Sequence, residues 1–490
     1  MQHNVTMLSD MAADLVQNVM AAVPESNTAL LGCLTTPNEM APSVNSLLSR
    51  AVESFLSKEY DSCVQLCEPL LDLTWEKLNT GHWKDVHLCW RYLYSLVSLL
   101  KGASEVVIAT IRSENTGNDV IKNNLANSIK TFDMGLLMGA PIFGNVLSKL
   151  SLHVHDWLGT NSSFQTPGAE LTSSGKKLIQ SDNLTENEDA KSTRLCCQCS
   201  EMCKEGNCEH FENISKKPKM EITNIKIKSK NQIKRVRCPS MELFRKEYLC
   251  SKHPVIITDA MGHWPAMGCR RWSLDYLKKI AGYRTVPIEI GSKYTDDKWT
   301  QKLMTVSEFI DQFITADMSR SNDVTGSRLK QDKPVGYLAQ HQLFNQIPEL
   351  QDDIVIPDYC VLGGTGSTNP ETSDDDVEEV DINAWFGPKG TVSPLHHDPK
   401  ENFLAQVVGR KYIRLYSEVM TPYLYPHDGF MDNTSQVDAV NPDYAKFPRF
   451  KNATYRECVL EEGEMLFIPQ KCWHYVRSLS VSFSVSFWWK

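Results

Sequence analysis

The chain has 490 residues, of which 41% are hydrophobic and 23% charged, and its formal net charge at pH 7 is −9. This length is enough for two or three domains with sizeable cores, and the composition is ordinary for a soluble globular protein. The net negative charge argues against nucleic-acid binding through bulk positive charge, so we expect no strong nucleic-acid signal.

The sequence predicts neither a signal peptide nor a membrane span. The apolar start near residues 11–23 is interrupted by Asp14 and lacks a basic leader. No other apolar run approaches the length needed to cross a bilayer. We therefore expect reduced thiols and a location in the cytosol or nucleus.

Residues 1–158 are predicted to form an α-helical N-terminal domain. In the segment 44–56 apolar side chains recur at helical spacing, and the segments 85–100 and 121–138 repeat this pattern. The aromatic residues of this part, Trp75 among them, are interpreted as core rather than as the lining of a peptide groove, because apolar stripes usually face a core. Several helices joined by short polar links indicate a bundle or a solenoid-like unit, and we see no strict period that would predict a true repeat protein.

Residues 159–235 are predicted to be a disordered linker that is polar, rich in cysteine and then basic. Five thiols and an imidazole between Cys196 and His210 could bind zinc, but the usual two pairs with a long spacer are missing, which favours an unstructured thiol-rich tract. The lysine-rich stretches at 216–219 and 226–237 are compatible with a nuclear import signal, a weak phosphate-binding patch or solvated charge.

Residues 236–490 are predicted to be an α+β domain built from many short strands. The expected strands and helices alternate with a polar loop at 316–334 and an acidic insert at 365–380. Residues 402–408 and 411–416 are expected to pair as a hairpin around Gly409 and Arg410. The last strand, 481–489, alternates with period two and is expected to be half-buried. Short antiparallel strands of this kind favour a double-stranded β-helix, which is a small barrel.

Two stretches of this domain resemble halves of one metal site. His396 and Asp398 are two residues apart, so in an extended strand both side chains project from the same face. The order of Gly463, a short apolar strand, Pro469 and then His474 resembles the second motif of the cupin superfamily. Two histidines and one carboxylate form the facial triad that holds non-haem Fe(II) and leaves positions open. We therefore predict that His396, Asp398 and His474 bind iron and are the catalytic centre.

An iron site of this type needs an electron donor to activate O2, and 2-oxoglutarate is a common one. Its distal carboxylate requires a cation deep in the barrel. Lys411 opens a strand with an apolar pattern beside the site, so it is the candidate for this cation. Because an unpaired lysine in a barrel interior would be costly, the opposite interpretation predicts that Lys411 is exposed.

The domain also resembles the Jumonji-C family of Fe(II)- and 2-oxoglutarate-dependent oxygenases. The motifs that carry this resemblance are the segments 237–240, 263–265, 284–294, 336–344, 383–388, 394–399, 409–416, 425–428 and 482–489, together with a looser match at 75–86. The resemblance implies a cupin-like barrel and a protein substrate, either an arginine-containing or a histone peptide. It also implies chromatin regulation, a role in the cell cycle and a nuclear location, with the cytoplasm as the alternative.

The resemblance implies roles for individual residues. Those that would hold 2-oxoglutarate are Tyr337, Ser393, Asn402, Lys411 and Trp488. Those that would line the pocket for the target side chain are Glu289, Gln340 and Trp385. The helices before the barrel would contact chromatin-associated partners.

Several functions fit this site. Arginine C-hydroxylation is the first, because a carboxylate such as Glu289 can pair with a guanidinium through two hydrogen bonds. Demethylation of histone methyl-lysine is the alternative, and the resemblance also carries a histone-tail peptidase activity. A non-catalytic cupin-like chromatin scaffold is the competing class, and a zinc hydrolase is the least favoured because no general base lies beside the triad in the sequence.

Overall fold

The computed structural model describes residues 2–34, 39–81, 85–111, 118–162, 225, 227–291, 299–316, 335–363 and 379–490. The cysteine cluster, the lysines at 216–219, nearly all of the loop 316–334 and most of the acidic insert lie outside these residues. Residues Met1–Ser162 and Ile227–Lys490 belong to one compact unit. Arg235, which the sequence assigned to the linker, lies in a strand of this unit.

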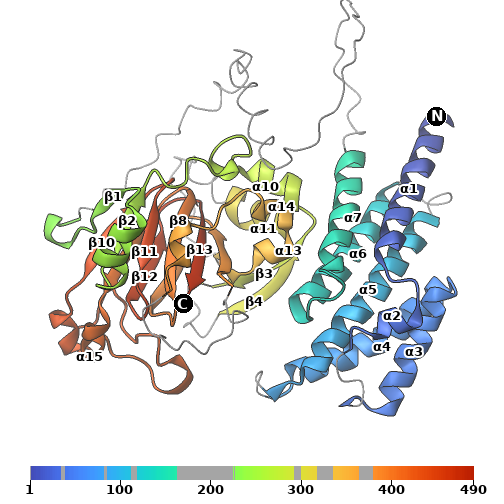
Figure 1. Cartoon of the computed structure of the whole chain (residues 1–490), viewed down its shortest axis with the longest axis horizontal. Helices are drawn as coiled ribbons and strands as arrows, with labels where there is room; N and C mark the ends of the chain where they lie inside the picture. Colours follow the sequence, from blue (N-terminus) through green and yellow to red (C-terminus); the bar gives the residue numbers. More distant parts are fainter. Residues whose placement is uncertain are drawn as a thin grey trace, which may run out of the picture. The chain divides into compact units, whose positions relative to one another are not determined.

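The N-terminal part is helical, as its apolar periodicity predicts, and is drawn from blue to teal in Figure 1. Its helices are α1 (Gln2–Ala22), α2 (Asn27–Leu31), α3 (Pro42–Leu56), α4 (Tyr60–Asn79), α5 (Leu88–Ile111), α6 (Asn118–Met138) and α7 (Val146–Ser162). They share one hydrophobic core, to which α5 contributes the largest set of buried residues. Trp75 does not belong to it, because 42% of this residue is exposed, and the interpretation of Trp75 as core was wrong.

Helix α5 corrects the expectation that no apolar run is long enough to cross a membrane. By length and composition alone this helix meets that requirement, and 78% of its most apolar window is buried inside the protein. The physical reason is its central place in the helical core, where several of its faces are covered by neighbouring helices rather than one.

The C-terminal part contains two sheets, which together confirm the predicted α+β class and the cupin-like barrel. Its strands are β1 (Arg235–Arg237), β2 (Val255–Thr258), β3 (Thr285–Ile290), β4 (Thr300–Thr305), β5 (Gly336–His341), β6 (Asp381–Gly387), β7 (Val392–His396), β8 (Glu401–Val408), β9 (Lys411–Tyr416), β10 (Arg456–Leu460), β11 (Met465–Ile468), β12 (Trp473–Ser478) and β13 (Ser482–Trp489). The larger sheet has the order β1-β2-β11-β8-β13-β6-β5-β3-β4, and the smaller has the order β10-β9-β12-β7.

Short helices connect the strands of the larger sheet, and several lie against it in Figure 1. The α-helices of this part are α9 (Met241–Phe244), α10 (Leu274–Ala281), α11 (Val306–Phe309), α13 (Leu343–Gln346), α14 (Pro348–Gln351) and α15 (Thr421–Leu424). Ser273 caps α10 by accepting a hydrogen bond from the Tyr276 amide, and Thr305 with Glu308 forms a capping box on α11.

The predicted hairpin of β8 and β9 is wrong, although both strands lie where the sequence placed them. Strand β8 pairs with β11 and β13, whereas β9 pairs with β10 and β12, so the turn between them passes from one sheet to the other. Gly409 has a φ of 72°, and a Cβ atom on it would lie 2.0 Å from the Val481 carbonyl oxygen. Only glycine allows the chain to cross this close to the start of β13.

Strand β13 is buried on both faces, which corrects the expectation of a half-buried strand. Ser482, Ser484 and Ser486 are fully buried, as are the aromatic and aliphatic residues between them. The serines are satisfied inside the barrel: Ser484 donates to Gln406, and Ser486 accepts from the Trp385 indole. The polar face of the alternating pattern therefore points into the barrel rather than into solvent.

Candidate active site

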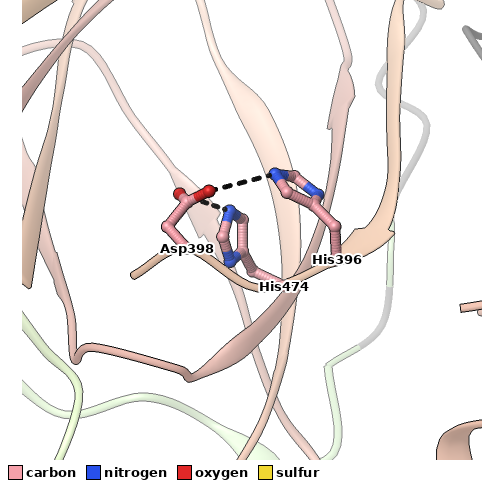
Figure 2. Close-up of side chains that lie close together, drawn as sticks. All are labelled: His396, Asp398 and His474. Atoms are coloured by element: carbon pink, nitrogen blue, oxygen red, sulfur yellow. Dashed lines mark ion pairs between the residues drawn. The ribbon is translucent and has the colours of Figure 1, made fainter. Parts of the chain in front are cut away.

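The side chains of His396, Asp398 and His474 come together, as Figure 2 shows. They lie at one end of the smaller sheet, where β7 pairs with β12. The Asp398 carboxylate lies 3.8 Å from His396 Nε2 and 3.5 Å from His474 Nε2. One potential ligand atom from each residue lies within 4.8 Å of the others, a spacing that suits a single metal ion. Among the described residues, this is the one cluster of three or more such groups.

The pairing of two strands brings the distant halves of this cluster together. His396 ends β7 and lies directly opposite His474 in the antiparallel ladder with β12. The centroids of the two imidazole rings are 4.2 Å apart. Asp398 follows β7 by two residues, and its backbone carbonyl accepts a hydrogen bond from the Lys471 amide at 2.9 Å. The loop before β12 therefore holds the carboxylate next to the two imidazoles.

Both imidazoles are oriented in the same way. His396 Nδ1 lies 2.7 Å from the Pro394 carbonyl oxygen, and His474 Nδ1 lies 3.0 Å from the Cys472 carbonyl oxygen. A proton on each Nδ1 satisfies these carbonyls and leaves the Nε2 lone pairs directed at the carboxylate, where a metal would sit. Burial, reinforced by the neighbouring His396, lowers the pKa of His474 to about 4, so this imidazole is neutral near pH 7.

The triad lines one pocket together with most of the residues expected to hold 2-oxoglutarate. Tyr337, Ser393, Asn402 and Lys411 all contribute to its wall, as does Trp385, which was expected on the side of the target residue. These side chains come from both sheets, so the pocket is the interior of the barrel.

Lys411 is a buried cation with no acidic partner among the described residues. It is 1% exposed, and its ammonium group donates to the Tyr337 hydroxyl at 3.3 Å. Burial alone lowers its pKa to about 7. Its environment is therefore that of a group which gains an anionic partner when a ligand binds.

Two further polar atoms in this region have no hydrogen-bond partner. Asn402 Oδ1 and Trp488 Nε1 are both buried and unpaired, and the two residues face each other across the β8–β13 ladder. Buried polar groups are rarely left unpaired in folded proteins. Of these residues, Lys411 and Asn402 line the pocket of the triad and Trp488 does not. The Lys411 ammonium and the Asn402 amide group can donate hydrogen bonds to a carboxylate ligand, and the donor set of the triad fits Fe(II).

The residues expected at the target side chain are less tightly grouped. Glu289 lies opposite Tyr337 in the β3–β5 ladder, and burial raises the pKa of its carboxyl group. Trp385 lies 6.3 Å from the Tyr337 ring, measured between centroids. Gln340 is exposed, at the end of β5, and has a φ of 46°. Of these three, only Trp385 lines the pocket of the triad.

The pocket also contains residues that the sequence did not point to. They are Leu404, Ile468, Val476 and Ser486. The alternation of serine with apolar residues in 482–489 was the available signal for Ser486. That signal did not show which face points into the barrel.

The comparisons with known proteins agree with this architecture. Residues 240–490 match the family model of a cupin-like domain, and residues 54–157 match that of KDM8-like, N-terminal ARM repeats. The second match corrects our expectation that the helical part is not a repeat protein. Its helices differ so much in length, from 15 to 24 residues between α3 and α5, that no fixed period is visible in the sequence.

Several proteins resemble the chain over most of its length. Lysine-specific demethylase 8 of Danio rerio is 44% identical over 86% of both chains. The protein of the same name in Xenopus tropicalis is 41% identical over 87% of this chain and 88% of its own. Lysine-specific demethylase JMJ30 of Arabidopsis thaliana is 37% identical over 86% and 85%, respectively. The chain therefore belongs to the Jumonji-C family of cupin-like oxygenases and carries KDM8-like ARM repeats before its oxygenase domain.

Proposed function

We propose that this chain binds Fe(II) and 2-oxoglutarate and oxidises a C–H bond in a basic side chain of a protein, with O2 as the oxidant. The observation that carries the proposal is the shared pocket: a two-histidine, one-carboxylate cluster and a buried lysine without an acidic partner line the same cavity. The first group suits Fe(II), and the second suits the distal carboxylate of 2-oxoglutarate.

Each group of residues has a defined task in this proposal. His396, Asp398 and His474 would hold the iron, with their Nδ1 protons fixed by backbone carbonyls. Lys411, Tyr337, Ser393, Asn402 and Trp488 would hold 2-oxoglutarate. When bound, iron would activate O2, which is the oxidant, and 2-oxoglutarate would supply two of the four electrons that O2 takes up. One oxygen atom would end in succinate, released with CO2, and the other in the hydroxylated side chain. The apolar wall of Leu404, Ile468 and Val476 would exclude water.

Demethylation of methyl-lysine is the first candidate outcome. Three of the proteins that resemble the chain are named lysine-specific demethylases. Hydroxylation of an N-methyl group gives a hemiaminal, which releases formaldehyde and leaves the amine with one methyl group fewer. The substrate of this reaction would be a methyl-lysine side chain, and we propose a histone peptide in the nucleus as its source.

Arginine hydroxylation is the second candidate, and Glu289 favours it. This carboxylate is half-buried next to Tyr337, and burial raises its pKa, so a cationic partner would stabilise its charged form. A guanidinium can donate two parallel hydrogen bonds to a carboxylate, whereas a methylated ammonium can donate few or none. Hydroxylation at a CH2 group of arginine gives a stable product.

Neither a peptidase nor a scaffold is supported equally well. The described residues hold one metal-type cluster, and it is the triad itself. All three ligand positions carry ligating side chains, which a non-catalytic scaffold would not require.

Mass spectrometry of peptides distinguishes the candidates. The full chain is incubated with Fe(II), 2-oxoglutarate and O2, and with arginine peptides and methyl-lysine peptides side by side. Loss of one methyl group supports the demethylase, and gain of one oxygen on arginine supports the hydroxylase. Asp398→Asn, which keeps the side-chain volume, is the control. If no peptide gives either product and no 2-oxoglutarate is consumed, the proposal is contradicted.

A further inference from the structure

Asp133 of helix α6 is a fully buried carboxylate whose hydrogen bonds all go to the start of β3. Its oxygens accept from Arg284 Nε at 3.0 Å, from Arg284 Nη2 at 2.7 Å and from the Thr285 backbone amide at 2.6 Å. Asp133 is 0% exposed and Arg284 is 1% exposed. A helix of the N-terminal part thus holds the first residue of a strand in the oxygenase domain.

The same contact continues to strand β5 through Gln346. Arg284 Nη2 also donates to the Gln346 carbonyl oxygen at 2.8 Å. The Gln346 amide donates to the Thr285 carbonyl oxygen at 2.8 Å, and its Oε1 lies 2.8 Å from His341 Nε2. The buried Gln346 side chain therefore bridges the first residue of β3 and the last residue of β5.

This bridge lies where the two strands no longer pair through their backbones. The β3–β5 ladder contains only the pairs Glu289–Tyr337 and Ile290–Gly336. At the opposite end of β5, which is the end next to the Gln346 bridge, the register of β5 against β6 shifts between Leu338 and His341. Side chains, rather than a backbone ladder, set the spacing of β3 and β5 at this end.

The strands joined in this way carry the residues expected at the target side chain. Glu289 lies on β3, and Gln340 lies on β5 next to His341. Gln340 has a φ of 46°, a conformation that the surrounding structure must enforce. The triad, by contrast, lies on and beside β7 and β12 of the other sheet.

We propose that Asp133 is a positioning residue for the substrate side of the site. Through Arg284, Thr285 and Gln346 it fixes the spacing of β3 and β5 at the end that carries Gln340, and so the placement of Gln340, without acting on the metal ligands. Glu289 lies at the opposite end, where the backbone ladder with Tyr337 already holds it. The inference rests on the proposed function for its catalytic consequence but not for its structural one. It assigns a role in substrate placement to the helical part of the chain.

Hydrogen exchange of the full chain without metal tests the structural consequence. In Asp133→Asn, Arg284 loses its charged partner, and the amides of β3 and β5 should exchange at least about tenfold faster while those of β7 and β12 change little. The matched control is His155→Phe. It removes a buried contact between α7 and the Lys279 carbonyl but keeps a ring against Tyr283. This control should not affect β3 or β5 selectively.

Turnover tests the catalytic consequence. In Asp133→Asn, consumption of 2-oxoglutarate without peptide should stay within about twofold of the wild type, and kcat/KM for a peptide that the wild type oxidises should fall at least about tenfold. If Asp133→Asn does not fold, Gln346→Met, which removes the bridge without leaving a buried charge unpaired, takes its place.

Two results would overturn the inference: exchange that rises equally in all strands, or peptide oxidation and 2-oxoglutarate consumption that fall in proportion. A wild-type chain that consumes no 2-oxoglutarate would instead count against the proposed function, and hydrogen exchange would still decide whether Asp133 fixes the two strands.

Discussion

Lys411 shows how a single residue can lower stability in favour of binding. It is buried with one hydroxyl partner, and burial lowers its pKa to about 7. A buried amine with so few partners costs free energy in the ligand-free protein, and it recovers this cost only when an anion binds.

Replacing Lys411 by methionine should therefore stabilise the ligand-free protein. Methionine has a similar length and no charge, so we expect the free energy of unfolding at pH 7 to rise by about 1–3 kcal/mol. Consumption of 2-oxoglutarate should be lost in the same variant. Thermal unfolding without metal and a succinate assay measure the two effects, and a destabilised variant that still turns over 2-oxoglutarate would refute the assignment.

The titration of Lys411 also predicts the pH dependence of co-substrate binding. In the free site its pKa is about 7, and a bound carboxylate would raise it. Above pH 7 the free lysine loses its charge, so binding must take up a proton, and KM for 2-oxoglutarate should rise by up to about tenfold per pH unit. Initial rates measured from about pH 6.5 to about pH 8.5 give this slope. In Lys411→Arg the charge persists over this pH range, so the slope should disappear. A wild-type KM for 2-oxoglutarate that stays flat or falls as the pH rises would contradict the assignment of Lys411 to its carboxylate.

At this scale the sequence predicted the grouping of His396, Asp398 and His474, which the structure brings together, better than the grouping of the residues expected at the target side chain. His396 and Asp398 are two residues apart, so they had to lie near each other. The strand argument was incomplete, because β7 ends at His396 and Asp398 lies beyond it, where its carbonyl accepts from the Lys471 amide. The positions of Glu289, Gln340 and Trp385 depend on the pairing of β3, β5 and β6, which no local pattern encodes.

Among the elements, the segment between β8 and β9 shows where local patterns fail. The sequence placed both strands, because their apolar runs and the glycine between them are local signals. It paired them with each other, because periodicity does not say which sheet a strand joins. Gly409 lies against the Val481 carbonyl, and this long-range contact determines the crossing.

Gly409→Ala should therefore be much more damaging than alanine at a comparable exposed glycine. The φ of 72° costs about 1–2 kcal/mol for an alanine, and the contact with Val481 must be relieved by moving backbone. We expect the free energy of unfolding to fall by about 2–4 kcal/mol in total.

Gly429→Ala is the matched control, because Gly429 has a φ of 73° and nothing lies within 4 Å of the position that a Cβ atom on it would take. In Gly429→Ala the free energy of unfolding should fall only by the cost of placing an alanine at a positive φ, about 1–2 kcal/mol. Equal losses in the two variants, measured by denaturant unfolding, would mean that the crossing is not tightly packed.

At the scale of the whole molecule, the ion pair of Asp133 and Arg284 joins the helical part to the oxygenase part. Sequence analysis could not predict this pair, because 151 positions separate its members. Removing one member leaves the other charge buried and unpaired, which is more costly than removing both.

A double-mutant cycle measures this coupling. Asp133→Asn and Arg284→Gln should each lower the free energy of local opening of β3 and β5, measured by hydrogen exchange, by about 3–5 kcal/mol. The double variant should lose less than the sum, by about 2–3 kcal/mol. Additive losses at the amides of β3 and β5 would show that the two side chains do not depend on each other.

The most direct test of the oxygenase assignment is succinate formation by the full chain. The wild type should convert 2-oxoglutarate to succinate only when Fe(II) and O2 are both present. Asp398→Asn should lose at least about 100-fold of this activity, more than the loss of a supporting residue would cause. A wild-type chain that binds iron but forms no succinate, or an Asp398→Asn chain that forms it at the wild-type rate, would contradict the account.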